Sequence, residues 1–208
     1  SGKASLVIPD SAVRVWLLQL PEIPRAHQAM IEMIRWKIKR GVPFRIEDAL
    51  ITWEVLSRPA GDQPGVVLAG LLPRATIAQF EAIMLDEGLK VGLVDISSFN
   101  LFNLIRGQTS ASGAGAGDVA FVNVTKSYFT LMIFRRGEMI FYRCKSHPAG
   151  EAGMPQERAK TLRRELAASL SYYTEKLKGG RLVQTLGRNA DPELVETGEI
   201  LSDLGFAP

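Results

Sequence analysis

Three short, strand-like segments lie close together in the second half of the chain, and they limit its fold more than any other feature. They are Asp118 to Thr125, Tyr128 to Arg135 and Glu138 to Lys145, and only tight turns connect them. Connections this short join antiparallel neighbours. The turn Arg135-Arg136-Gly137-Glu138 also carries a glycine, as hairpin turns commonly do. The sequence therefore predicts a three-stranded antiparallel sheet in this region.

A long amphipathic helix follows these segments, from about Pro155 to Lys178. Proline at its start and Gly179-Gly180 at its end are ordinary helix boundary residues. Its apolar residues recur at helical spacing and form one stripe. The stripe consists of Ala159, Leu162, Leu166, Leu170, Tyr173 and Leu177. A strand at Arg181 to Leu186 and a helix at Pro192 to Leu204 follow, so the order is strand–strand–strand–helix–strand–helix.

The first half mixes predicted strands and helices. Val66 to Leu71 is a continuous apolar run, which is typical of a strand buried on both faces, and Val91 to Ile96 is predicted to be another buried strand. The other predicted strands are Ser5 to Ile8, Val13 to Gln19 and Leu50 to Leu56. The predicted helices are Arg25 to Arg40, Arg74 to Glu87 and a short one from Ser97 to Ile105.

Composition excludes several classes of protein. Of the 208 residues, 46% are hydrophobic and 23% charged, which excludes disorder, collagen and coiled coils. The net charge is only +3, so nucleic-acid binding does not follow from it. A single cysteine, Cys144, and two histidines, His27 and His147, argue against disulfides and against a metal centre. We expect His147, next to Pro148, to be exposed in a loop.

Location and chain ends can also be predicted. The longest apolar stretch, Gly65 to Leu72, is far shorter than the roughly 20 residues of a membrane-spanning helix. No secretory leader opens the chain, so we expect a cytosolic, reducing compartment. The opening Ser1-Gly2 without a methionine is typical of a trimmed terminus, and we expect the natural chain to extend further upstream.

Several segments arrive in an order that resembles a known family. They are Leu6-Val-Ile-Pro-Asp10, the turn Leu18 to Pro24 (LQLPEIP), Ile34 to Leu56, the region Gly117 to Arg143, and Ala168 to Tyr173 (ASLSYY). Together they resemble the PilM family, the actin-like cytoplasmic scaffold of type IV pilus assembly. The cytoplasmic domain of the GspL family of type II secretion is the near relative. The resemblance implies an α/β, actin-like (ribonuclease-H-like) ATPase fold, although a fold alone assigns no function.

The resemblance also implies a domain organisation. Residues 1–12 and 88–106 would be parts of actin-like subdomain 1A, residues 13–87 an inserted βαββα subdomain 1C, and residues 118–208 the second lobe. Residues 107–117 (GQTSASGAGAG) would be a flexible linker, because they follow neither the order nor the Gly-Lys ending of a phosphate loop. The family's first phosphate-loop hairpin is missing, so the fold is N-terminally incomplete. An edge left open in this way makes self-association an expectation.

The nucleotide site that the family fold implies is altered in this sequence. The family's second phosphate hairpin has Asp-Ile-Gly-Ala where this chain has Asn123-Val124-Thr125-Lys126, and an asparagine is a poor ligand for magnesium. The vestigial nucleotide-binding residues are Asn123, Thr125, Lys126, Ser127 and, in the expected adenosine loop, Gly187 and Arg188. We expect no catalytic residues, no metal and no cofactor. The alternative is an active actin-like or sugar-kinase-type ATPase that binds Mg-ATP once the missing hairpin completes it.

The family resemblance implies partners as well. A groove between subdomains 1A and 1C would take the cytoplasmic peptide of a bitopic membrane protein, PilN, with Trp36, Pro43, Phe44 and Ile46 as candidate lining residues. The alternative is that Trp36 and Phe44 pack in the core. A cytoplasmic motor ATPase is a further expected partner, and the protein would lie in the cytoplasm, peripheral to the inner membrane. The basic cluster Arg35 to Arg40 would face an anionic membrane surface, an acidic partner or simply water.

Overall fold

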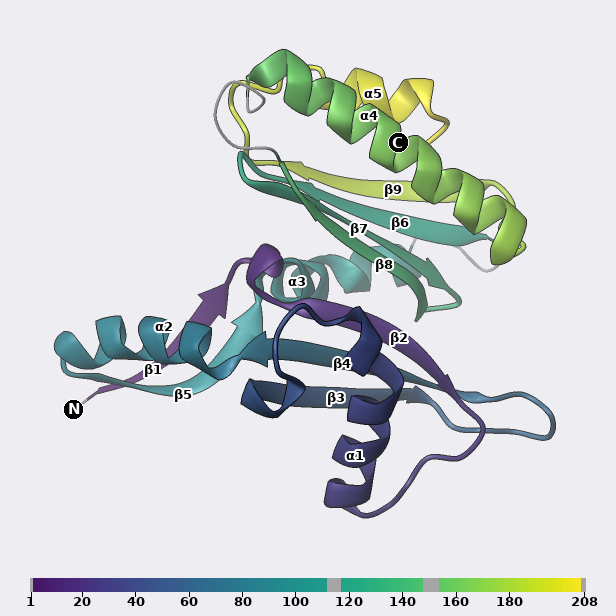
Figure 1. The fold of residues 1–208 in the computed structure, drawn as a ribbon. Helices are drawn as coiled ribbons and strands as arrows, with labels where there is room; N and C mark the ends of the chain where they lie inside the picture. The colour runs from purple at the N-terminus through teal and green to yellow at the C-terminus, as the bar shows by residue number, and fades with distance from the viewer. Residues whose placement is uncertain (1, 112–116, 148–153, 207–208) are drawn as a thin grey trace. The chain divides into compact units, whose positions relative to one another are not determined.

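The computed structural model describes residues 2–111, 117–147 and 154–206. The chain divides into two compact units, residues 1–96 and residues 97–208. Figure 1 shows the elements of both units. Each unit has its own sheets and its own hydrophobic core.

The first unit contains two sheets and two α-helices. Between β1 and β5 the chain forms β2, α1, β3, β4 and α2, in the predicted order. The bounds are β1 (Gly2–Ile8), β2 (Arg14–Leu20), α1 (His27–Ile38), β3 (Ala49–Ser57), β4 (Gly65–Pro73), α2 (Arg74–Asp86) and β5 (Leu89–Ile96). A short 3-10 turn, η2 (Lys39–Gly41), continues α1, and another, η3 (Ile46–Asp48), precedes β3.

The larger sheet of the first unit has the antiparallel order β2-β4-β3. Its central strand, β4, is buried along most of its length, as its continuous apolar run predicts. Helix α1 contributes Met30, Ile34 and Ile38, which are four residues apart and therefore lie on one face of the helix. These residues form a core with the sheet residues Leu20, Val67, Ala69 and Leu71.

The smaller sheet pairs β1 and β5 in parallel. Leu6 and Ile8 pack with Ile77 of α2 on one face. On the other face, Val7 and Leu93 are 50% and 59% exposed. The prediction that Val91 to Ile96 is a buried strand was therefore wrong for one face, because α2 covers only one side of this two-stranded sheet within the unit.

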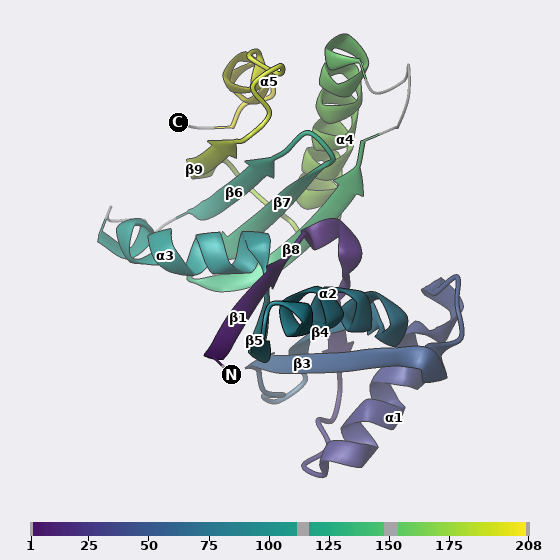
Figure 2. The ribbon, with the colours of Figure 1, turned by 90° about the vertical axis from the view of Figure 1, so that its left-hand side faces the viewer.

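The second unit is a four-stranded sheet with helices on both faces (Figure 2). The strand order is β8-β7-β6-β9, in which β6 and β9 are parallel and the other neighbours antiparallel. The predicted order of elements after residue 117 is confirmed. The bounds are α3 (Ser97–Ala111), β6 (Asp118–Val124), β7 (Tyr128–Arg135), β8 (Glu138–Ser146), α4 (Pro155–Lys176), β9 (Leu182–Asn189) and α5 (Thr197–Asp203).

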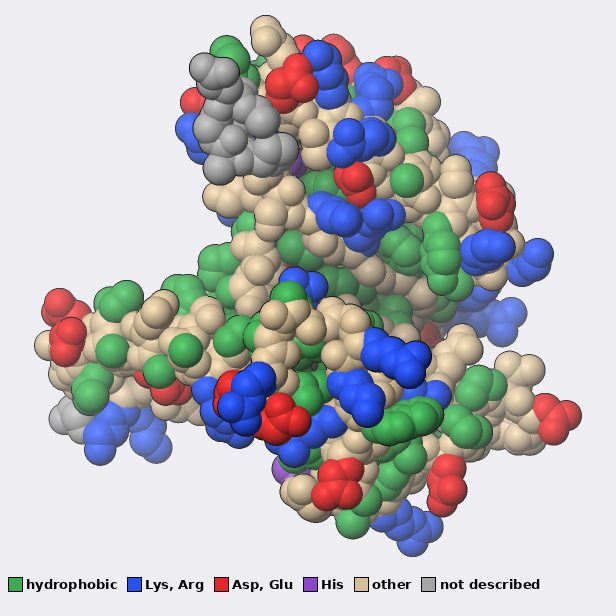
Figure 3. Space-filling model, in the orientation of Figure 1, with side chains coloured by type: hydrophobic (Ala, Val, Ile, Leu, Met, Phe, Trp, Pro, Cys, Tyr) green, Lys and Arg blue, Asp and Glu red, His purple; other side chains and the backbone are tan. Residues whose placement is uncertain are grey.

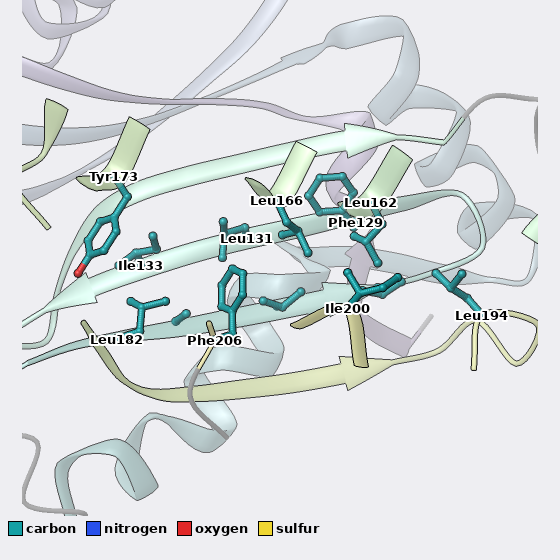
Figure 4. Packing of buried hydrophobic residues seen from close by; sticks show 13 residues of the cluster. Phe129, Leu131, Ile133, Leu162, Leu166, Tyr173, Leu182, Leu194, Ile200 and Phe206 are labelled. Atoms are coloured by element: carbon teal, nitrogen blue, oxygen red, sulfur yellow. The ribbon is translucent and has the colours of Figure 1, made fainter. Parts of the chain in front are cut away.

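The core of the second unit lies between the sheet, α4 and α5 (Figure 4). The whole predicted stripe of α4 packs there, from Ala159 to Leu177. On the other face of the sheet, Phe102 of α3 stacks on Phe134 with ring centroids 3.9 Å apart. Strands β6 and β7 are therefore buried on both faces.

Helix α3 and strand β9 both end several residues later than the sequence predicts. Helix α3 continues to Ala111, so its end lies within the predicted linker 107–117, of which residues 112–116 lie outside the described residues. Strand β9 continues to Asn189 because its last residues pair with Val122 to Val124 of β6. The contacts place α3 with the second unit, whereas the sequence grouped residues 88–106 with the start of the chain.

Candidate functional site

The predicted phosphate hairpin is the turn between β6 and β7, and its key residue, Asn123, lies at the end of β6. Alternation along the strand places Val122 and Val124 in the core with α4, so Asn123 lies on the opposite face. Its side chain is completely buried. A buried amide must make hydrogen bonds within the protein, and those bonds decide what else it can bind.

Both ends of the Asn123 amide are hydrogen-bonded. Its Nδ2 donates to the Ser98 hydroxyl at 2.9 Å, and its Oδ1 accepts from Nη1 of Arg188 at 2.9 Å. Arg188 lies directly opposite Asn123 in the parallel pairing of β6 and β9. The oxygen that would face a magnesium ion therefore already faces a guanidinium cation. A second cation at this oxygen would be repelled.

The turn after β6 is closed by its own hydrogen bonds. The Thr125 hydroxyl donates to the Tyr128 carbonyl at 2.8 Å and accepts from the amides of Ser127 and Tyr128. The Thr125 amide also donates to the Tyr128 carbonyl at 2.8 Å. The hydroxyl of Thr125 and the amide of Ser127 are thus used within the turn rather than being directed at a ligand.

Lys126, at the tip of the turn, forms an ion pair with Glu193. Their Nζ and Oε1 atoms are 3.1 Å apart, and the two side chains are 64% and 45% exposed. Glu193 also accepts from Arg158 at 2.9 Å. Hydrogen bonds from Arg158 and Lys126 hold the pKa of the Glu193 carboxyl below its usual value. Lys126 therefore belongs to a network of charges within the second unit.

The centre of this network is a buried ion pair between Arg158 of α4 and Asp191. The Nε and Oδ2 atoms are 2.9 Å apart, and the side chains are 3% and 0% exposed. Asp191 also accepts the amide proton of Glu193 at 3.1 Å. The pair joins the first turn of α4 to the segment after β9.

His147 is buried beside this pair, so its predicted exposure was wrong. Its amide donates to the Ser127 carbonyl at 2.8 Å, which draws it in against Phe129, with ring centroids 6.1 Å apart. It is only 9% exposed. Burial, with the nearby Arg158 charge, lowers the pKa of the His147 imidazole, although the Asp191 carboxylate acts in the opposite direction.

A second charged cluster lies at the other end of β6. Asp118 accepts three hydrogen bonds from Arg135, the shortest 2.7 Å, and one from the Tyr173 hydroxyl, also 2.7 Å. Burial alone would raise the pKa of Asp118, but these bonds hold it below the usual value. Burial and the bond to Asp118 raise the pKa of Tyr173 to about 12. The cluster connects β6, β7 and α4.

The four residues predicted to line a peptide groove do not form one exposed surface. Ile46 is buried in the core of the first unit, and Phe44 packs against the same core. Trp36 is 67% exposed and Pro43 is exposed. The alternative interpretation, core packing, is therefore correct for Phe44 and wrong for Trp36.

The sequence reasoning missed the Arg158–Asp191 pair, although a signal for it existed. Arg158 lies four residues before Leu162, so it continues the buried stripe of α4. A charge on such a stripe requires a partner of opposite charge. The acidic residues after β9, Asp191 and Glu193, were the available partners.

Gly187 and Arg188, which the sequence placed in an adenosine loop, instead pair with Val122 and Asn123 within the sheet. No group of side chains among the described residues could hold a metal ion. None of the described helices is long and apolar enough to span a membrane.

The arrangement of the second unit defines an actin-like α/β fold: three antiparallel strands, a crossover helix and a parallel fourth strand. No protein-family model and no curated protein matches the chain. Among solved structures, the chain is similar to a chain of the PilM-PilN type IV pilus biogenesis complex, with a TM-score of 0.77 and 15% identity. The match covers 99% of this chain and 68% of that chain.

Two further solved structures share the fold. One is a protein of Bacteroides thetaiotaomicron with an actin-like ATPase fold and unknown function (TM-score 0.53, 11% identity, covering 96% of this chain and 63% of that one). The other is the cytoplasmic domain of EpsL, an inner membrane component of the type II secretion system of Vibrio cholerae (TM-score 0.51, 13% identity, 97% and 73%). The predicted actin-like fold and its likeness to PilM are thus confirmed at the level of the fold.

Proposed function

We propose that this chain is an actin-like assembly protein of a type IV pilus or type II secretion system that acts by binding other proteins rather than by hydrolysing ATP. The likeness of its fold to a chain of the PilM-PilN complex supports the first part. Hydrogen bonding around the β6–β7 turn supports the second. The protein would lie in the cytoplasm, peripheral to the inner membrane.

The observation that carries the proposal is the hydrogen bonding of Asn123. Magnesium prefers several oxygen ligands, carboxylates above all. Asn123 offers a neutral amide whose oxygen is held by the Arg188 guanidinium and whose nitrogen is held by Ser98. Together with the closed turn at Thr125, this arrangement favours a degenerate nucleotide site that strengthens the fold.

The proposed partner is the cytoplasmic segment of a PilN-like membrane protein, and the proposed contact surface is on the first unit. Pro43 is the candidate groove residue that is exposed next to Phe44, which packs into the core. A short peptide would place an apolar side chain against such a surface. A cytoplasmic motor ATPase would be a second partner of the assembled complex.

Calorimetric titration with Mg-ATP tests the absence of nucleotide binding, and it should use the chain with its natural upstream residues. We expect no heat of binding and no phosphate release. Heat that disappears in Asn123→Ala and Lys126→Ala would overturn this part of the proposal and support the ATPase alternative.

Fluorescence anisotropy with a labelled N-terminal peptide of the PilN-like protein tests the partner. We expect saturable binding that weakens about fivefold or more in Pro43→Glu, as for a residue at the centre of an interface. Val195→Glu is the matched control, because Val195 is 82% exposed in the second unit. Absence of binding, or equal weakening in both variants, would contradict the proposed surface.

A further inference from the structure

The three tryptophans of the chain occupy two kinds of environment. Trp16 and Trp53 pack against the core of the first unit. Trp36, in the last turn of α1, is 67% exposed. An exposed tryptophan points to a binding surface, because the indole ring is apolar and its N–H is polar. Tryptophan is therefore enriched at protein interfaces and at the membrane–water interface.

Trp36 is followed in the sequence by exposed cations. The Lys37 Nζ lies 5.5 Å from the centre of the Trp36 ring. Lys39 and Arg40 follow Trp36 by three and four residues, in the 3-10 turn η2 that continues α1. All three cations are exposed, and within the described ranges none forms an ion pair with a carboxylate. We call Trp36, Lys37, Lys39 and Arg40 the α1 patch.

The α1 patch differs from the other exposed apolar surface on a helix of this unit. At the end of α2, Ile83 and Leu85 are 63% and 62% exposed, but their charged neighbours are Asp86 and Glu87. The two helix ends therefore carry opposite charge next to apolar side chains. Figure 3 shows Lys and Arg side chains beside hydrophobic ones over the region in which Figure 1 draws the end of α1.

We propose that the α1 patch docks on an anionic lipid bilayer. The long stems of Lys and Arg let their charged ends reach lipid headgroups while the apolar carbons lie along the surface. Each cation close to an anionic membrane contributes about fivefold to binding, and a tryptophan prefers the level of the headgroups. The patch combines three such cations with one indole ring.

An acidic protein is the less favoured occupant. Lysine is depleted at the centres of protein–protein interfaces, and two of the three cations are lysines. The centre of a protein interface also typically contains a pocket that encloses the aromatic anchor. Trp36 instead lies beside the end of the flexible Lys37 side chain, an arrangement that suits a fluid surface of headgroups.

Bilayer docking goes beyond the proposed function and does not depend on it. A peptide-binding protein without membrane affinity would bind the PilN-like peptide and ignore lipid vesicles. A membrane-docking protein of a different function would do the reverse. Vesicle binding in the absence of any peptide therefore tests this inference alone.

The test is sedimentation with vesicles of phosphatidylcholine containing about one third phosphatidylserine, compared with pure phosphatidylcholine. We expect binding to the anionic vesicles only, with weaker binding at higher salt. Lys39→Gln/Arg40→Gln should lower the binding constant by about fivefold per cation. Tryptophan emission should shift to shorter wavelength on vesicle binding, and Trp36→Phe should remove that shift.

The matched control is Arg58→Gln/Lys90→Gln, which removes two exposed cations of the same unit outside the α1 patch. Circular dichroism shows whether each variant is folded. Equal losses in the control and the patch variant, or equal binding to both kinds of vesicle, would overturn the proposal. Two further results would overturn it in favour of another occupant. One is binding to an acidic polypeptide but not to vesicles, and the other is self-association that Lys39→Gln/Arg40→Gln abolishes.

Discussion

The two units differ in how deeply their ion pairs are buried. In the first unit, the Arg45–Asp48 pair has atoms 3.8 Å apart and side chains that are 78% and 68% exposed. In the second unit, the Arg158–Asp191 pair has side chains that are 3% and 0% exposed. The second unit therefore holds an ion pair in its interior, whereas the Arg45–Asp48 pair of the first unit lies at its surface.

This difference indicates different roles for charge. In the second unit, Arg158–Asp191 and the Asp118–Arg135–Tyr173 cluster join the sheet to α4 at opposite ends of β6. Such bonds have strict geometry and fix how the helix lies on the sheet. In the first unit, apolar side chains form the core between α1 and the three-stranded sheet, and the exposed cations of the α1 patch are available to a partner.

The largest effect is expected for Arg158→Met. The change leaves the Asp191 carboxylate buried without its cation, which should lower the free energy of unfolding of the second unit by about 3–5 kcal/mol. Urea unfolding, with hydrogen exchange of the α4 amides as the local measure, checks this value. The double variant Arg158→Met/Asp191→Leu should recover part of the loss, because it removes the uncompensated charge. A cost below about 1 kcal/mol for Arg158→Met would contradict the distinction between the units.

A smaller loss is expected for Tyr173→Phe. The change removes the 2.7 Å hydrogen bond to Asp118 but keeps the ring in the core. A hydrogen bond to a charged group contributes about 1.5–3 kcal/mol, and Arg135 still pairs with Asp118. Tyr172→Phe is the control, because Tyr172 is next in the chain and 49% exposed. Equal costs for the two variants in urea unfolding would show that the cluster at Asp118 does not stabilise the unit.

Much of the fold could be predicted because its signals are local. The α4 stripe, the hairpin at Arg136-Gly137 and the buried run of β4 each depend on residues close together in the sequence. The φ angles of Arg136 and Gly137 are 52° and 81°, as a type I′ hairpin turn requires. The full length of β9 was not predictable in this way, since its end is fixed by pairing with β6.

The candidate site was predicted only in part, for the same reason. Asn123 could be singled out by its place in the hairpin, but its partners Ser98 and Arg188 are 25 and 65 residues away. The exposure of Trp36 had a local signal that was not used. Trp36 follows Ile34, a buried residue, by two positions, which is a rotation of about 200° around the helix and points it away from the core.

His147 gives the second unit a pH dependence. Its pKa is lowered from 6.5 in the folded state, so the unfolded chain binds the proton at higher pH than the folded chain does. Stability should therefore fall as the pH falls from 6.5 toward the lowered pKa, and then level off for this group. Urea unfolding between about pH 7.5 and pH 5 should show this slope, and His147→Gln should reduce it. His27→Gln, in the first unit, is the control and should leave the slope unchanged. If His27→Gln removes the slope, the pH dependence belongs to His27 and the prediction for His147 is wrong.

The smallest effect is expected for Arg45→Met, the counterpart of the first variant in the other unit. Arg45 and Asp48 are in water, where Coulomb attraction is weak and the two side chains lose freedom by pairing, so the pair should contribute less than about 1 kcal/mol. The variant also replaces a charge next to η3 without opening a cavity, because Arg45 is exposed. Urea unfolding should give a small difference that becomes smaller still at high salt, because salt screens exposed charges. A cost that approaches that of Arg158→Met would mean that charge contributes equally to both units, and that the exposed cations of the first unit are needed for its own stability rather than free for a partner.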